Sequence, residues 1–260
     1  MKSPIGVFDS GLGGLTVLRA LRARLPAEDF LYFADTRFLP YGDRPEAFLK
    51  ERGLVIAEAL AARGAKALVI ACNTATAAAA EAIRAATDLP VVALEPGVKP
   101  AAALTRRGII GVLATTRTLE SERFRRLVDN HAHHVRVLAR ACPGLAEAIE
   151  AHGPGSEQVA GHLDVFVTPL TAAGADVVVL GCTHYPWVAQ AIAARLPADV
   201  RIVDTGEAVA RQLERLLAAG QLLGGGGGRL AVATSGAPAT VRETVIRLWG
   251  EPLPVEFWEI

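Results

Sequence analysis

The chain has no net charge. Its 260 residues include 27 lysines and arginines and 27 aspartates and glutamates. Proteins that bind nucleic acids carry a basic patch that neutralises phosphates. The two short arginine-rich stretches here, 106–107 and 123–126, are typical of solvated helix faces or helix ends. We therefore expect no nucleic-acid partner.

Long apolar segments are also missing. No uncharged apolar stretch reaches the roughly 20 residues of a membrane-spanning helix, and the Ala-rich run 74–86 contains Glu81 and Arg84. The four residues before Ile5 are too few for the apolar part of a secretory signal. We therefore expect a cytoplasmic protein without a membrane partner. The 51% hydrophobic content is sufficient for a packed core.

Cysteine is scarce as well, and occurs only as Cys72, Cys142 and Cys182. An odd number of cysteines at wide spacing, without a secretory signal, argues against a disulfide framework. In a cytosolic protein, each such cysteine is either a small buried hydrophobic residue or a reactive thiol. The residues around each cysteine must decide between these two possibilities.

The apolar residues that are present follow two periodicities. Short runs rich in Val, Ile and Leu alternate with longer segments in which leucines recur every three or four residues. Such alternation is typical of an α/β protein whose parallel sheets are covered on both faces. Helices are expected at 15–25, 45–63 and 205–219. Strands are expected at 5–9, 31–34, 67–71, 91–94, 109–113, 135–139, 176–180, 201–203, 229–234 and 255–258. The run 224–228 consists of glycines and is expected to form a flexible surface turn.

Three segments of the chain have similar counterparts further along, in the same order. Ala67–Thr74 resembles Val177–His184, Ile5–Ser10 resembles Ile110–Thr115, and Val92–Gly97 resembles Arg201–Gly206. This internal similarity predicts two pseudo-symmetric parallel-sheet α/β domains. One comprises residues 1–96 with 207–260, to which the C-terminal strands return, and the other comprises residues 97–206.

Cys72 and Cys182 each lie just past the end of an apolar strand, where ligands bind in parallel sheets. Polar side chains follow each cysteine, Asn73–Thr74 in one segment and Thr183–His184 in the other. Each segment then leads towards a helix, whose N-terminal N–H groups stabilise a thiolate. A structural cysteine needs none of these neighbours, so both thiols are predicted to be reactive.

Two thiols on related units suit a reaction that is itself nearly symmetric. In a racemisation, one thiolate removes the α-proton and an opposing thiol returns a proton to the other face. A single base would instead have to move around the carbon. Proton transfer by a positioned group contributes only about 10²–10⁴-fold, so positioning and charge stabilisation must supply the rest. The pattern predicts a racemase with Cys72 and Cys182 as its two proton carriers.

Supporting groups stand close to these cysteines in the sequence or at another strand end. Asp9 ends the first strand and precedes a glycine-rich turn, whose N–H groups can meet a carboxylate. We expect Asp9 to assist Cys72 or to hold the substrate ammonium. His184 follows Cys182 by two residues and is expected to exchange its proton. Tyr41, in a Pro-Tyr-Gly turn, is equally consistent with a residue that covers the core.

Cofactors are not expected. Pyridoxal phosphate requires a Schiff-base lysine, and Lys2, Lys50, Lys66 and Lys99 all lack suitable surroundings. The histidines at 131, 133 and 134 lack a companion cysteine or carboxylate pair, so no metal is expected there. Spacing alone does not exclude zinc on Cys72, Cys182 and His184, because this combination of ligands occurs in catalytic sites.

The motifs Phe8–Gly14, Pro40–Gly42, Ala71–Ala75 and Gly181–Pro186 together resemble those of bacterial glutamate racemases, in the aspartate/glutamate racemase family. The resemblance extends in order over residues 5–257. The Cys-Thr-His-Tyr-Pro segment distinguishes glutamate racemases from the aspartate racemases that share their fold.

This resemblance implies two α/β domains with the active site in the cleft between them, no cofactor, a homodimer, and D-glutamate supplied for peptidoglycan. Cys72 and Cys182 would be the proton donors and acceptors, supported by Asp9 and His184. The residues implied in glutamate binding are Asp9, Ser10, Tyr41, Gly42, Asn73, Thr74, Thr118, Glu150, Thr183 and His184. The preference for glutamate comes from the resemblance alone.

Three other functions fit part of the pattern. The first is a racemase of the same fold that acts on aspartate or another acidic amino acid. The second is an amino-acid-binding protein, which would need the hydroxyls at the strand ends but not two thiols. The third is a zinc hydrolase.

Overall fold

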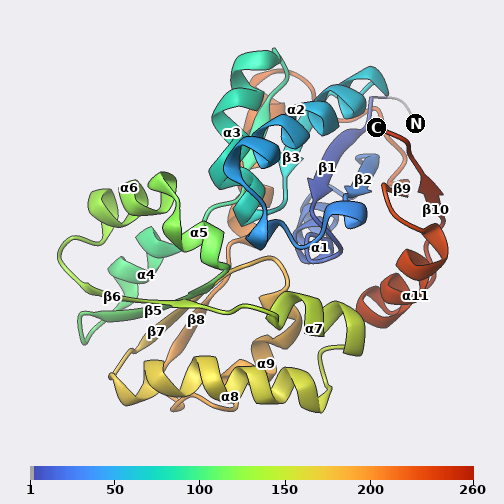
Figure 1. Ribbon diagram of the computed structural model, residues 1–260. Coiled ribbons are helices and arrows are strands. Elements are labelled where there is room, and N and C mark those ends of the chain that lie inside the picture. Colours follow the sequence, from blue (N-terminus) through green and yellow to red (C-terminus); the bar gives the residue numbers. More distant parts are fainter. Residues whose placement is uncertain (1–2) are drawn as a thin grey trace. The chain divides into compact units, whose positions relative to one another are not determined.

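The computed structural model describes residues 3–260, which contain ten strands (Figure 1). They are β1 (Ile5–Asp9), β2 (Phe30–Ala34), β3 (Ala67–Ile70), β4 (Val91–Ala93), β5 (Ile109–Ala114), β6 (Arg136–Ala141), β7 (Val177–Gly181), β8 (Arg201–Val203), β9 (Leu230–Thr234) and β10 (Val255–Phe257). All neighbouring strands run parallel, in one sheet of order β10-β9-β2-β1-β3-β4 and another of order β6-β5-β7-β8. The predicted α/β class with parallel sheets is therefore confirmed.

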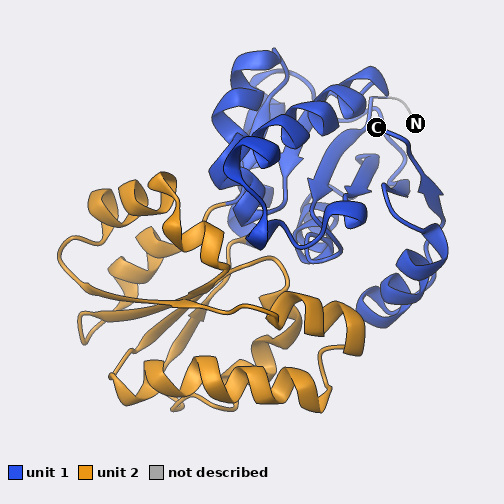
Figure 2. Cartoon of the chain, in the orientation of Figure 1, with its two compact units in different colours: residues 1–94, 206–260 blue, residues 95–205 orange. Residues whose placement is uncertain are grey.

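The chain divides into two compact units, coloured separately in Figure 2. The first contains residues up to Leu94 together with Gly206–Ile260, and the second is the continuous segment Glu95–Thr205. Each unit has its own sheet. Because β9 pairs with β2, the strands after Gly206 extend the sheet of the first unit.

The two sheets share a four-strand order. The strands β2-β1-β3-β4 are neighbours in the first unit, and β6-β5-β7-β8 occupy the corresponding positions in the sheet of the second unit. The three pairs of similar segments lie on β1 and β5, on β3 and β7, and on β4 and β8. The internal similarity in the sequence therefore corresponds to a repeated topology.

In the first unit, α2 and α3 approach each other closely above the sheet. Their core includes Phe8, Leu68 and Ile70 from the strands. A Cβ atom at Gly53 in α2 would lie only 2.7 Å from the Cβ atom of Ala79 in α3, so small residues set this helix spacing. The helices of this unit are α1 (Leu15–Arg24), α2 (Glu46–Ala62), α3 (Asn73–Ala86), α10 (Gly206–Ala219) and α11 (Pro238–Trp249), with the 3₁₀ turns η1 (Thr36–Phe38) and η2 (Tyr41–Asp43).

In the second unit, Val98, Phe124 and neighbouring apolar side chains pack against β5 and β7. A Cβ atom at Gly111 in β5 would lie 2.7 Å from Leu170 of α8, so this glycine lets the helix approach the strand. The helices of this unit are α4 (Val98–Leu104), α5 (Thr116–Glu120), α6 (Glu122–His131), α7 (Leu145–His152), α8 (Glu157–Ala172) and α9 (Ala189–Ala193), with the 3₁₀ turn η3 (Tyr185–Val188). Across residues 3–260, no helix has both the length and the apolar character to cross a membrane.

Candidate active site

Cys72 lies at the N-terminal end of α3, after β3 and one further residue. Its backbone is extended, and its thiol sulfur accepts a hydrogen bond from the main-chain N–H of Ala75 at 3.4 Å. The partial positive charge at a helix N-terminus favours the thiolate over the thiol. The next two residues, Asn73 and Thr74, are buried in the first turn of the same helix. The predicted position of this thiol beyond a strand end is confirmed.

Asp9 shapes the glycine-rich loop beside Cys72. Its fully buried carboxylate accepts hydrogen bonds from the main-chain N–H groups of Ser10 at 2.7 Å and Gly14 at 2.6 Å. Gly14 has no room for a side chain, since a Cβ atom there would lie 2.8 Å from the Cβ atom of Asp9. The hydroxyl of Ser10 lies 3.8 Å from the sulfur of Cys72. The structure thus brings Asp9, Ser10 and Cys72 together at the carboxyl ends of β1 and β3.

Tyr41 and Gly42 lie in η2, and the phenol of Tyr41 is turned into the core. Its hydroxyl donates a hydrogen bond to the Oδ2 atom of Asp35 at 2.5 Å, and the side chain is 2% exposed. Burial and the charge of Asp35 raise the pKa of Tyr41 far above its usual value, so the phenol stays protonated. The side chain of Tyr41 therefore covers the core, which is one of the roles that its position in a Pro-Tyr-Gly turn allows.

Cys182 comes directly after β7 and lies beside a buried imidazole. Its sulfur is 3.6 Å from the Nδ1 atom of His184, and the Nε2 atom of His184 is 2.7 Å from Oε1 of Glu150. Burial opposes a charged imidazole, but the contacts with Cys182 and Glu150 outweigh it and raise the pKa of His184 well above its usual value. A thiol, an imidazole and a carboxylate in series form a typical activated nucleophile or base.

The candidate residues of the second unit follow three neighbouring strands in the chain. Thr118 lies in α5 after β5, Glu150 lies in α7 after β6, and Cys182 follows β7. The hydroxyl of Thr115, which caps α5, donates to the buried hydroxyl of Thr118 at 2.9 Å. Thr183 is buried next to Cys182. In parallel sheets, residues at the carboxyl ends of strands form the ligand-binding edge.

The third cysteine, Cys142, differs from the other two. Its thiol is buried and donates to the main-chain oxygen of Arg140 at 3.4 Å. Burial raises its pKa to about 12, so it is a neutral thiol. All three cysteines are buried, and Cys142 is assigned the structural role because its thiol is held neutral.

His133 and Lys66 belong to the groups that were weighed for a metal and a cofactor, and both make contacts within the fold. In the described chain, no three His, Cys, Asp or Glu side chains are grouped so as to hold a metal ion. The Nδ1 atom of His133 lies 3.3 Å from the main-chain oxygen of Asp129. Lys66 forms an ion pair with Glu28 at 2.6 Å and donates to main-chain oxygens of the 222–224 segment. Lys2 lies outside the described residues.

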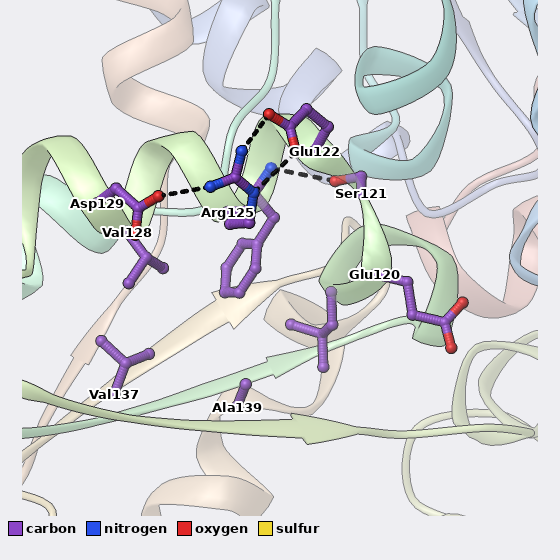
Figure 3. A pocket seen from close by; sticks show the side chains of 10 residues that line it. Glu120, Ser121, Glu122, Arg125, Val128, Asp129, Val137 and Ala139 are labelled. Carbon is purple, nitrogen blue, oxygen red and sulfur yellow. Dashed lines mark hydrogen bonds and ion pairs between the residues drawn. The ribbon is translucent and has the colours of Figure 1, made fainter.

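A pocket of about 340 Å³ lies between α5, α6 and β6, and none of the predicted catalytic side chains lines it (Figure 3). Its floor is apolar, with Phe124 and Val137 among its residues. Its rim contains Glu122, Arg125 and Asp129, of which the arginine bonds both acids. The lining contains neither a cysteine nor a histidine, so the predicted two-thiol chemistry does not take place in this pocket.

Sequence reasoning missed two residues near Tyr41, namely Asp35 and Arg52. Asp35 directly follows β2, just as Asp9 ends β1, and this strand-end position was a usable signal. Arg52 lies inside α2, where no periodicity distinguishes a buried arginine from an exposed one.

The chain thus combines two parallel sheets of repeated topology with a cysteine past the carboxyl end of β3 and of β7, and comparison with known proteins shows the class to which it belongs. Residues 15–213 match the model of the Asp/Glu/Hydantoin racemase family. The chain belongs to this family and is an amino-acid racemase, an isomerase.

Within the family, the similarity is to bacterial glutamate racemases. The chain is 48% identical to the glutamate racemase of Stutzerimonas stutzeri strain A1501, over 98% of this chain and 97% of that protein. A solved glutamate racemase isoform of Bacillus anthracis is 31% identical with a TM-score of 0.89, covering 99% and 98% of the two chains. The Escherichia coli glutamate racemase, solved with L-glutamate and the activator UDP-MurNAc-ala, is 30% identical with a TM-score of 0.87 and the same coverage.

Proposed function

We propose that this protein interconverts L-glutamate and D-glutamate without a cofactor, using Cys72 and Cys182 as proton carriers on opposite faces of the α-carbon. The observation that carries the proposal is the matching position of the two thiols, each past the carboxyl end of equivalent strands β3 and β7. The similarity to glutamate racemases over nearly the whole chain supports glutamate as the substrate.

In the proposed reaction, one cysteine thiolate removes the α-proton and becomes a thiol. The electron pair left on the α-carbon is delocalised into the substrate carboxylate, whose developing charge needs hydrogen-bond donors. The other cysteine, initially a thiol, delivers its proton to the opposite face and becomes a thiolate. The reverse reaction starts from the exchanged protonation states, so one site serves both enantiomers.

The neighbouring groups would help each cysteine in turn to carry the negative charge. The helix N-terminus at Cys72 and the protonated imidazole of His184 at Cys182 both favour a thiolate. Asp9, with both carboxylate oxygens held by main-chain N–H groups, would fix the loop that carries Ser10 next to the substrate. Glu150 would keep His184 protonated through its 2.7 Å contact.

The substrate would bind past the carboxyl ends of the strands, where Cys72 and Cys182 lie. The remaining polar residues of the resemblance, among them Asn73, Thr118 and Thr183, would contact the amino and carboxylate groups. Supply of D-glutamate for peptidoglycan and a homodimer are part of the same proposal.

The decisive experiment measures racemisation and α-proton exchange in D₂O with L- and D-glutamate, in the presence of a chelator. Cys72→Ser and Cys182→Ser should each lower the racemisation rate by about 10²–10⁴-fold, because a serine hydroxyl is a much weaker acid than a thiol. Cys142→Ala is the matched control and should retain most of the activity, because that thiol is buried and neutral.

The other outcomes separate the alternatives. Activity on aspartate but not on glutamate would keep the mechanism and reject the substrate. Exchange with neither amino acid would favour the binding-protein interpretation, and activity that the chelator abolishes would favour zinc. Full activity in either serine variant would reject the two-thiol mechanism.

A further inference from the structure

A buried ion pair lies behind the loop that carries Tyr41. Asp35, which follows β2, is completely buried, and Arg52 of α2 is 7% exposed. The guanidinium of Arg52 donates two hydrogen bonds to this carboxylate, from Nε to Oδ2 at 2.8 Å and from the terminal nitrogen to Oδ1 at 2.7 Å. This bidentate geometry fixes the direction of the carboxylate as well as its position.

The same carboxylate also holds Tyr41. The Oδ2 atom of Asp35 accepts from the Tyr41 hydroxyl at 2.5 Å and from Arg52 at 2.8 Å. Tyr41 is therefore tied to α2 through one shared oxygen atom. Since its ring is buried, a shift of the carboxylate would move the main chain of Tyr41 and of the adjacent Gly42.

Arg52 has two further contacts that leave it little freedom. Its guanidinium lies 4.7 Å from the ring centre of Phe38, at the other end of the same loop. Its remaining terminal nitrogen donates to the main-chain oxygen of Ile260 at 2.7 Å. Arg52 thus holds both η1 and η2, and each of its three bonding directions is used within the first unit.

A buried ion pair adds little net stability, because removing two charges from water costs about as much as their attraction returns. Its value lies in fixing one geometry. We propose that Asp35 and Arg52 are positioning residues, which hold the Tyr41–Gly42 main chain in the place where it meets the substrate. This inference rests on the proposed function, in which Tyr41 and Gly42 line the glutamate site.

The test compares Arg52→Lys, Tyr41→Phe and the double variant with wild type, by steady-state kinetics on both enantiomers and by thermal unfolding. Lysine keeps the charge but not the bidentate fork, and phenylalanine keeps the ring but not the hydroxyl. Each single variant should raise KM by about tenfold and change kcat by less than about threefold. The double variant should raise KM less than the product of the two single effects, because both act through Asp35.

Arg63→Lys is the matched control. Arg63 ends the same helix, α2, where its guanidinium lies 3.9 Å from the ring centre of Trp258 and bonds the main-chain oxygen of Ala59. Its substitution should leave KM unchanged. A lower melting temperature with unchanged KM in Arg52→Lys and Tyr41→Phe would show a merely structural role and overturn the inference.

Failure of the proposed function would look different, since wild type itself would then not racemise glutamate. In that case, isothermal titration with glutamate decides the positioning role without turnover. Weaker binding of glutamate in Arg52→Lys and Tyr41→Phe than in wild type supports the positioning role. Equal binding in the three proteins, or no binding in wild type, contradicts it.

Discussion

Cys72 and Cys182 occupy equivalent positions after β3 and β7, but their immediate surroundings differ. Cys72 accepts a hydrogen bond from the N–H of Ala75 at the start of a helix, whereas Cys182 lies beside the imidazole of His184. The helix N-terminus provides a partial charge that does not titrate, while an imidazole can lose its proton. The second unit is therefore the one in which a titrating group lies beside the cysteine.

This difference predicts a pH effect in Glu150→Gln. The carboxylate of Glu150 helps to raise the pKa of His184, so its removal lowers that pKa. The imidazole of His184 loses its charge when the pH rises through its pKa. A lower pKa therefore moves this loss of charge to lower pH. The alkaline limb of kcat/KM should therefore move to lower pH. Profiles of kcat/KM against pH for both enantiomers would show it.

The control for this measurement is Glu157→Gln, at an exposed position in the first turn of α8. Its profile should coincide with that of wild type. An unchanged alkaline limb in Glu150→Gln would mean that the charge of His184 does not limit the reaction.

At the scale of elements, the glycine run between α10 and β9 is a loop that side chains outside the run hold in place. Its main-chain N–H groups donate to carboxylates at the end of the loop before β2, from Gly224 to Glu28 at 2.6 Å and from Gly227 to Asp29 at 2.8 Å. Gly226 lies against the backbone there, since an added Cβ would be 2.5 Å from the nitrogen of Asp29. The run is a surface connection, as predicted, but its backbone is held at several points.

We predict that Gly226→Ala and Gly227→Ala differ strongly in stability. A Cβ atom at position 226 would collide with backbone atoms that cannot move aside, at a cost of about 2 kcal/mol in the free energy of unfolding. Gly227 has open space for a Cβ atom and keeps its N–H bond, so its substitution should change stability by less than about 0.5 kcal/mol. Urea unfolding of both variants measures the difference, and equal values would contradict this account of the loop.

How much the sequence revealed depends on whether a feature is local. All ten strands were expected close to their observed bounds, because runs of Val, Ile and Leu between polar segments are short-range signals. Cys72 and Cys182 were identified from the residues that follow them. Arg52 was not identified, because its partners Asp35 and Ile260 are distant in the sequence. The contact of Glu150 with His184 was equally invisible, since it joins residues from different strand-end segments.

At the scale of the whole chain, the repeated topology places one unit inside the sequence of the other. The second unit is the continuous segment Glu95–Thr205, and the first is completed only after it. The two ends of this segment meet, since a Cβ atom added at Gly97 would lie 2.6 Å from Val203 and 3.1 Å from Thr205. Adjacent termini are typical of a domain that can be inserted into another without strain.

The second unit also has the features of an independently folding domain. Its sheet order β6-β5-β7-β8 is complete within the segment, and its core around Val112, Phe124 and Val179 draws only on its own residues. The ion pair of Arg123 with Glu95 lies within the unit as well. A domain of roughly 100 residues is large enough to bury such a core.

We therefore predict that a protein consisting of residues 95–205 folds on its own. Its far-ultraviolet circular dichroism should show mixed helix and strand, and its thermal unfolding should be a single cooperative transition, because the segment keeps its whole sheet and core. The same segment with Val179→Asp provides the control, since a charge on the buried strand β7 should abolish that transition. A segment without a cooperative transition, or one that Val179→Asp leaves equally stable, would show that this core forms only within the full chain.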